Sequence, residues 1–252
     1  YGNSFSSALS LPISHVSVNA NASSFTIGKV TNASDITIAS AISISGPIAI
    51  YGGNIAINAA LTATSSNLSL YATGAVSQTS AITASGLVLR GSGGFTLTNA
   101  SNNIATIASG SSVGAISILN NANLTIGSVT FSGVAYNGIN STGVISVKTP
   151  RNLTISQSVS TTSGSATPSA PAILLASGSS SAAGDVTYNI VLSGSPTFSV
   201  GSGGIVDFYS GDADQSTGLS TYVNSQSSKS YTYYATLSTQ PTAAGFNVIY
   251  RG

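Results

Sequence analysis

The stretch ITIASAISISGPIAIYGGNIAI, residues 36–57, repeats one short pattern four times. Each unit places a small or polar residue between two isoleucines: ITI begins at 36, ISI at 42, and IAI at 48 and again at 55. An alternation with a period of two, carried by β-branched residues, is typical of β-strands that have one buried face. The pattern therefore predicts a series of strands that are each about three to five residues long.

The same alternation continues through most of the chain. It recurs as LSL at 68, FTL at 95, ISI at 116, and LTI at 124 and 153. Gly, Ser and Asn stand between the units, and these residues accept the backbone conformations that tight corners require. Asn directly precedes a unit at positions 54, 67, 103, 123 and 152. These features predict an all-β fold with repeated corners.

A second, longer period links the units. Similar positions recur at Ile36 and Ile55, Ile48 and Leu68, Leu68 and Leu87, Phe95 and Ile116, Leu124 and Ile145, and Leu153 and Ile173. This spacing, about 20 residues, lies within the range of stacked repeat units. Because such short strands are not stable alone, each unit must bury its apolar side chains against its neighbours. The sequence thus predicts a parallel β-helix, a solenoid of about ten coils.

Charge is scarce throughout. Charged residues make up 4% of the chain, whereas a typical globular domain has roughly 25%. In a parallel stack, equivalent residues lie about 4.8 Å apart, so a repeated charge would form a repulsive row, while Ser, Thr and Asn can hydrogen-bond along it. Uncharged repeats therefore suit the predicted architecture.

The composition also excludes several classes of protein. The six basic residues are scattered, and only Lys148 and Arg151 lie close together, so no basic patch for nucleic acid is expected. The chain has no Cys, which excludes a thiolate metal site and a thiol nucleophile. It has no apolar run of about 18 residues, so we expect no membrane insertion as a helix.

The pattern divides the chain into two parts of one domain. Residues 1–205 are predicted to form the coils, with a Ser/Pro/Ala-rich loop near residues 161–171. Residues 206–252, where Asp and Tyr replace aliphatic residues, are predicted to form a C-terminal coil and a cap. We expect the tyrosines of this segment to cover the last coil and also to contact a surface or a partner. They include Tyr222, Tyr231, Tyr233 and Tyr234.

The amino-terminal stretch YGNSFSSALSLPISHVSV, residues 1–18, has no evident polar cap. Because an open solenoid end exposes unpaired strand edges, end-to-end self-association is a second expectation.

Two closing segments resemble a known family. VDFYSGDADQSTGLSTYV (206–223) and NVIYRG (247–252), together with coils such as NLSLYATGAVSQTSAI (67–82), resemble the large bacterial surface proteins related to filamentous haemagglutinin. The resemblance implies a right-handed parallel β-helix, export by the two-partner route to the bacterial cell surface, and a role in adhesion, aggregation, biofilm or filament formation. The secretion motifs of that family are not found, so the resemblance implies an interior or carboxy-terminal portion of such a chain.

Two alternative functions remain open from the residues. The chain has no Glu, and Asp207, Asp212 and Asp214 are the sole acidic cluster, which could serve a polysaccharide-active enzyme or a calcium site. Turn formation is the simpler role for these residues. A self-assembling or ice-binding solenoid would use the outward threonines, but Ser and Ala interrupt their rows. These threonines are Thr26, Thr37, Thr96, Thr125 and Thr154.

We therefore expect a non-enzymatic extracellular segment with no catalytic residue, metal or cofactor. Its expected partners are a host or bacterial surface, protein or glycan, or copies of itself.

Overall fold

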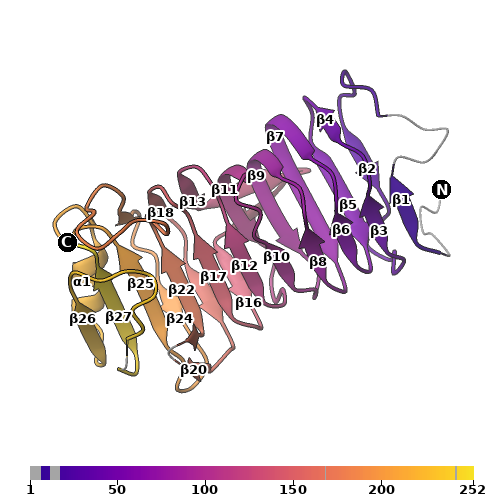
Figure 1. Ribbon diagram of the computed structural model, residues 1–252. Helices are drawn as coiled ribbons and strands as arrows, with labels where there is room; N and C mark the ends of the chain where they lie inside the picture. Colours follow the sequence, from indigo (N-terminus) through magenta and orange to yellow (C-terminus); the bar gives the residue numbers. More distant parts are fainter. Residues whose placement is uncertain (1–6, 12–17, 168, 242) are drawn as a thin grey trace.

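The computed structural model describes residues 7–11, 18–167, 169–241 and 243–252, and these residues form an elongated stack of short strands (Figure 1). The stack runs from β1 at one end to β26 at the other. Within the described residues the only helix is the six-residue α1 (Leu219–Asn224). The all-β prediction is confirmed.

The long sheet, as we call it, has eleven strands, and all its pairings are parallel. In spatial order its strands are β1 (Leu9–Leu11), β3 (Ile36–Ile38), β6 (Ile55–Ile57), β8 (Val76–Gln78), β10 (Phe95–Leu97), β12 (Ile116–Leu119), β17 (Ile145–Lys148), β22 (Ile173–Ala176), β25 (Val206–Ser210), β27 (Phe246–Tyr250) and β26 (Lys229–Thr232).

A second sheet contains nine strands, again paired in parallel. Eight follow one another as β2 (Phe25–Ile27), β5 (Ile48–Gly52), β7 (Leu61–Ala72), β9 (Ile82–Arg90), β11 (Asn103–Ser109), β13 (Leu124–Ile126), β18 (Leu153–Ile155) and β23 (Ile190–Leu192), and β4 (Ile42–Ile44) pairs with β7. A third parallel sheet contains β16 (Ile139–Ser141), β19 (Val159–Thr161) and β24 (Phe198–Ser199). These stacked parallel sheets agree with the predicted solenoid architecture.

The core is a continuous row of apolar side chains, most of them aliphatic, between the sheets. Along the long sheet, Ile36 pairs with Ile55, Ile55 with Val76, and Val76 with Phe95, and all four are at most 1% exposed. Each such side chain contributes roughly 1.5–3 kcal/mol when fully buried. The intervening residues of the same strands point outward, because successive side chains in a strand alternate between its faces.

These outward residues form what we call the ladder face of the long sheet. Its members follow one another in register from one strand to the next, and all are uncharged: Ser10, Thr37, Ala56, Ser77, Thr96, Ser117 and Ser146. None of them belongs to the buried core.

Carboxamide side chains support the corners through hydrogen bonds rather than through the left-handed backbone suggested by the sequence, because no Asn among the described residues has a positive φ. Asn54 Oδ1 accepts a 2.8 Å hydrogen bond from the backbone N–H of Ala75, 21 residues later. Asn102 is fully buried, and its Oδ1 accepts a 2.9 Å bond from the N–H of Ile82. Buried backbone groups need such partners, so these side chains replace the ladder hydrogen bonds that a strand would otherwise supply.

Two of the spacings inferred from the sequence are wrong. Leu124 pairs with Leu153 rather than with Ile145, and Leu153 pairs with Ile190 rather than with Ile173. Ile145 lies instead between Ile116 and Ile173 in the long sheet. The reason is an antiparallel hairpin, β14 (Ser128–Phe131) and β15 (Val134–Asn137), which lengthens this part of the chain.

The hairpin β14–β15 lies over the second sheet. Phe131 and Val129 pack with Val88 and Ala108 on the outward side of that sheet. The β14–β15 connection is Ser132-Gly133, with φ of 49° and 78°, the left-handed conformation that two-residue hairpin turns favour.

The regions near 161–171 and beyond 206 are more regular than expected. A second small hairpin, β20 (Ala166–Thr167) and β21 (Ala170–Pro171), lies within the predicted loop. Beyond residue 206, β25 and β27 continue the long sheet in parallel with β22.

Candidate binding cleft on the long sheet

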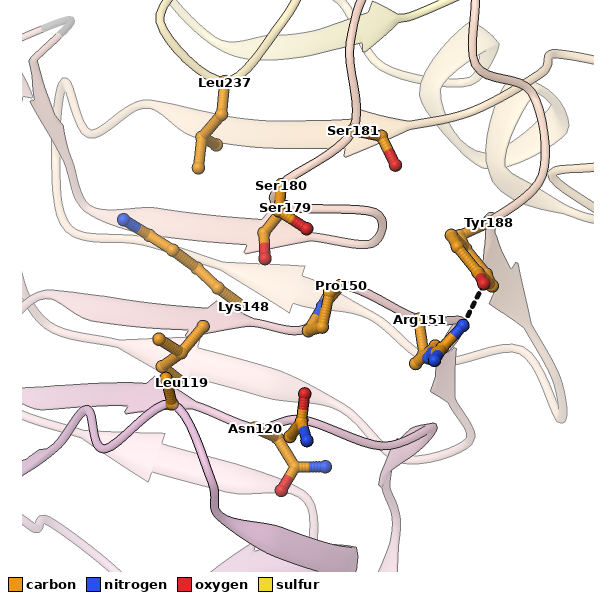
Figure 2. A pocket seen from close by; sticks show the side chains of 12 residues that line it. Leu119, Asn120, Lys148, Pro150, Arg151, Ser179, Ser180, Ser181, Tyr188 and Leu237 are labelled. Atoms are coloured by element: carbon orange, nitrogen blue, oxygen red, sulfur yellow. Dashed lines mark hydrogen bonds between the residues drawn. The ribbon is translucent and has the colours of Figure 1, made fainter.

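A cleft of about 590 Å³ opens on the outside of the long sheet, next to the corner that follows β17 (Figure 2). Its wall residues come from β12, from β17 and the corner after it, from residues 179–188 and from Leu237 of the C-terminal segment. They include Leu119, Lys148, Pro150, Arg151, Ser179, Ser180 and Tyr188. Segments far apart in the sequence thus form one concave surface.

The corner after β17 positions the two basic residues. Lys148 is the last residue of β17, and it follows the buried Val147, so the alternation of the strand places its side chain on the outward side of the sheet. Thr149 is fully buried; its Oγ1 donates a 2.6 Å hydrogen bond to Ala122 O and accepts one of 3.1 Å from the N–H of Arg151. Because Pro150 has no N–H to extend the ladder, the strand ends here and Arg151 turns to the cleft's rim.

Arg151 and Tyr188 meet at that rim. The guanidinium carbon lies 5.1 Å from the centroid of the Tyr188 ring, and the guanidinium donates a hydrogen bond to the Tyr188 hydroxyl. The same pair borders a second hollow of about 510 Å³, lined also by Asn121, Asn123 and Asn152. The pair therefore borders both depressions.

Arg251 holds the 177–188 wall of the cleft in place. Its side chain is 3% exposed and donates to three carbonyl oxygens: Ser177 at 2.8 Å, Tyr188 at 2.6 Å and Asp185 at 3.1 Å. Burial lowers the pKa of Arg251, and the Asp185 carboxylate opposes this effect. Hydrogen bonds from Ser181 and Thr187 lower the pKa of Asp185 to about 2, so this carboxylate is ionised at neutral pH.

The cleft has a positive charge. Lys148 and Arg151 line it, and none of the five aspartates does. The Lys148 ammonium makes no hydrogen bond or ion pair with any residue that the structure describes. Asp185 does not line the cleft, but Ser181, which does, donates a hydrogen bond to its carboxylate. Such a surface can bind an anion together with neutral hydroxyl groups.

The acidic cluster predicted as a catalytic or calcium site does not converge. Asp207 is fully buried on the long sheet; its Oδ1 accepts a 2.8 Å bond from Asn247 Nδ2, and its Oδ2 has no partner within the described residues. Burial raises the pKa of Asp207 to about 6. Asp212 Oδ1 instead accepts from the backbone N–H groups of Asp214 and Gln215, at 2.7 and 3.3 Å, which is the turn geometry expected of Asp.

No group of three acidic, His or Cys residues suited to a metal ion occurs in the described ranges. The one histidine, His15, lies outside them.

Three of the four predicted contact tyrosines pack against aromatic rings in the C-terminal part of the stack, in two separate groups. Tyr222 of α1 packs edge-on against Phe198 and Phe246, with centroids 5.0 and 5.9 Å away. Tyr231 and Tyr233 stack on Tyr250 at 6.5 and 5.5 Å.

The fourth, Tyr234, is the most exposed of the large apolar or aromatic side chains in the described residues, at 74%, and Tyr233 is 59% exposed. Sequence reasoning identified this aromatic group, but it did not find the Arg151–Tyr188 pair.

No protein-family model matches this chain, and no curated protein or solved structure is significantly similar to it. Across the described residues, no helix is long and apolar enough to cross a lipid bilayer.

Proposed function

We propose that this chain is a non-enzymatic extracellular segment of a bacterial surface adhesin or filament. In this proposal it is a right-handed parallel β-helix of about ten coils, with a Tyr-rich C-terminal cap. Its task is mechanical: the rod presents a regular, uncharged surface to a host or bacterial surface or to further copies of itself.

The ladder face is the observation that carries the proposal. Small uncharged side chains follow one another in register across seven strands, from Ser10 to Ser146. A row of this kind offers many weak contacts of similar chemistry. Contacts repeated along one rigid body add through multivalency, so binding does not require a single strong site.

Self-association has a structural basis at the carboxy-terminal end. Strand β26 is the last strand of the long sheet and pairs only with β27 within the described residues. An unpaired parallel edge can accept a further strand. The matching prediction for the amino-terminal end falls partly on residues 1–6 and 12–17, which lie outside the described ranges.

The two alternatives receive less support. A polysaccharide-active enzyme needs two carboxyl groups that face one space, but Asp207 is buried and Asp212 closes a turn. An ice-binding face needs an unbroken row of threonines. On the long sheet, Ala56 and Ser77 separate Thr37 from Thr96, while Thr26, Thr125 and Thr154 belong to the second sheet.

Bead adhesion under flow tests the proposal. Microspheres coated with the protein are passed over an epithelial monolayer and over glass coated with the same protein, with albumin-coated spheres as the blank. The variant carries Thr96→Arg and Ser146→Arg, which add bulk and charge to two separate rungs of the ladder face. The control carries Ser43→Arg and Thr130→Arg, at exposed positions away from that face.

The proposal predicts that the protein-coated spheres are retained above the albumin blank on at least one surface. Retention should fall several-fold with the face variant and stay unchanged with the control. Retention no greater than that of albumin on both surfaces would contradict the proposal.

A further inference from the structure

We infer that the cleft beside Lys148 and Arg151 is a discrete binding site for a carboxylated saccharide. The inference rests on the proposed adhesive function and adds to the ladder face a site of defined chemistry. Its ligand class follows from the charge, the polar groups and the shape of the cleft.

The positive charge of the cleft favours an anionic ligand. The cleft contains two of the six basic residues of the chain and none of its five aspartates. In Figure 2 the Lys148 and Arg151 side chains lie on opposite sides of Pro150, so the two cations flank the middle of the cleft. The Lys148 ammonium has no partner within the described residues, which leaves its three donors for a ligand.

The uncharged polar groups that line the cleft favour a saccharide over a simple inorganic anion. The side chains of Asn121, Ser179 and Ser180 line the cleft and make no hydrogen bond within the described part of the chain. Hydroxyl and carboxamide groups both donate and accept, which matches the hydroxyl groups of a sugar. The buried Asn120 is excluded from this set, because its amide already bonds with Ile104 and Ala122.

Apolar parts of the lining suit the remaining surface of a sugar ring. Leu119, Pro150 and Leu237 present aliphatic groups between the polar ones. Tyr188 adds an aromatic ring at the rim, and its stacking on Arg151 orients the guanidinium plane. A planar guanidinium matches the geometry of a carboxylate. The volume of about 590 Å³ is within the range of sites for small ligands.

The cleft is built before the ligand arrives. Arg251 fixes the backbone of Ser177, Asp185 and Tyr188, and Thr149 fixes the corner that carries Arg151. A wall that is already ordered loses little conformational entropy when a ligand binds. Binding of a short oligosaccharide in solution should therefore be measurable without the multivalency of a coated surface.

Calorimetric titration with a galacturonic acid tetramer tests the inference on the full chain. The carboxyl-reduced tetramer, which keeps the sugar rings but removes the charges, is the matched neutral ligand, and a sulfated tetrasaccharide is the competing anion. The variants are Lys148→Gln and Arg151→Gln. Lys29→Gln is the control, because it removes one exposed cation near the far end of the stack.

We expect the uronate tetramer to bind, with an affinity at least ten-fold above that of the reduced form. Each cleft variant should weaken binding about ten-fold, added salt should weaken it as well, and Lys29→Gln should leave it unchanged. Equal binding of the reduced form, tighter binding of the sulfated sugar, or no binding of the uronate would overturn the inference. Loss of uronate binding by Lys29→Gln would overturn it too.

These results separate the two proposals. Absence of uronate binding by a protein whose coated spheres still adhere would remove the cleft site and leave the proposed function standing. Uronate binding by a protein whose spheres do not adhere would leave the cleft site without the function on which it rests.

Discussion

The side-chain oxygen of Asn152 accepts a 2.7 Å hydrogen bond from the backbone N–H of Asn189, 37 residues later. The N–H of Asn152 itself bonds to Asn123 Oδ1, and Asn189 Oδ1 accepts from the N–H of Asp212. One corner of the stack is therefore held by a chain of carboxamides, and each side-chain oxygen accepts a hydrogen bond from a backbone N–H of the next coil. Uncharged side chains can be stacked in this way without repulsion, whereas a row of charges could not.

Replacing one member of this chain tests its contribution. Asn152→Ala leaves the Asn189 N–H without its acceptor, so we expect unfolding to become easier by about 1–2 kcal/mol. Asn121→Ala is the matched control, because the Asn121 side chain makes no hydrogen bond within the described residues, and it should change stability by less than about 0.5 kcal/mol. Urea unfolding followed by circular dichroism gives both values. Equal effects of the two substitutions would show that the carboxamide chain contributes nothing.

Asp207 makes stability depend on pH. Its pKa is raised from 3.8 to about 6 by burial, so the folded state holds this proton more tightly than the unfolded state. The stabilisation by Asp207 is therefore complete below about pH 4, is lost as the pH rises to about 6, and is constant above it. The total change is about 2–3 kcal/mol.

Asp207→Asn keeps the acceptor for Asn247 and removes the titration. We expect this variant to be more stable than the unmodified chain at pH 7, with the difference falling to about 1 kcal/mol at pH 4.5. Unfolding midpoints measured between pH 4.5 and pH 7.5 check this, with the exposed Asp214→Asn as the control. Asp185, whose pKa is about 2, acts in the opposite direction but only at lower pH. A variant less stable than the parent at pH 7 would contradict the assignment.

Alanine substitutions at two glycines distinguish the effect of a packing clash from the effect of backbone strain. Gly178 and Gly203 have φ of 50° and 79°, so an added side chain is strained at both. At Gly178 a Cβ would also lie 2.3 Å from a guanidinium nitrogen of Arg251, whereas nothing lies within 4 Å at Gly203. We expect Gly203→Ala to cost about 1 kcal/mol and Gly178→Ala at least about 1 kcal/mol more, because Arg251 must give up carbonyl partners.

Hydrogen exchange of residues 177–188 provides the specific signal. Gly178→Ala should accelerate exchange in this segment, while Gly203→Ala should not. Equal exchange in the two variants would mean that Arg251 does not hold the wall of the cleft.

Arg90 fastens the hairpin β14–β15 to the second sheet. Its guanidinium carbon lies 5.7, 5.5 and 5.4 Å from the ring centroids of Tyr51, Tyr71 and Tyr136, and Tyr136 belongs to the hairpin. Each cation–π contact of this kind is worth about 0.5–1 kcal/mol. Arg90→Gln should therefore speed amide exchange across residues 128–137 several-fold. Lys148→Gln, which removes a cation with no aromatic partner, is the control, and an equal effect of that variant would contradict the role of Arg90.

The sequence predicted the repeating part of the fold well for a physical reason. Units such as Ile36-Thr-Ile38 and Ile55-Ala-Ile57 encode both the strand and its buried face, and they pair in the predicted register. The pairing of Leu124 with Leu153 was missed, because the inserted hairpin has the same alternation as a coil strand, as Val129-Thr-Phe131 shows.

The candidate site was only partly visible in the sequence. The spacing of Lys148 and Arg151 marks them as the one close basic pair, but Tyr188 and Ser179 meet them only because a long excursion returns to the same corner. Local patterns carry no information on such a return. The aromatic group near Tyr250, by contrast, is dense enough in the sequence to be recognised.

The proposed adhesive contacts are spread along the repeated face, so removal of one whole coil should weaken adhesion without abolishing it. Deleting residues 55–75 joins Asn54 to Val76, which the register allows, because Ile55 and Val76 occupy the same position in successive rungs. The deletion leaves the cleft residues intact. The measurement is retention of coated microspheres under flow, with circular dichroism to establish that the shortened chain is folded. Retention should fall in part. Unchanged retention, or complete loss of retention in a folded protein, would show that adhesion is not spread along the repeated face.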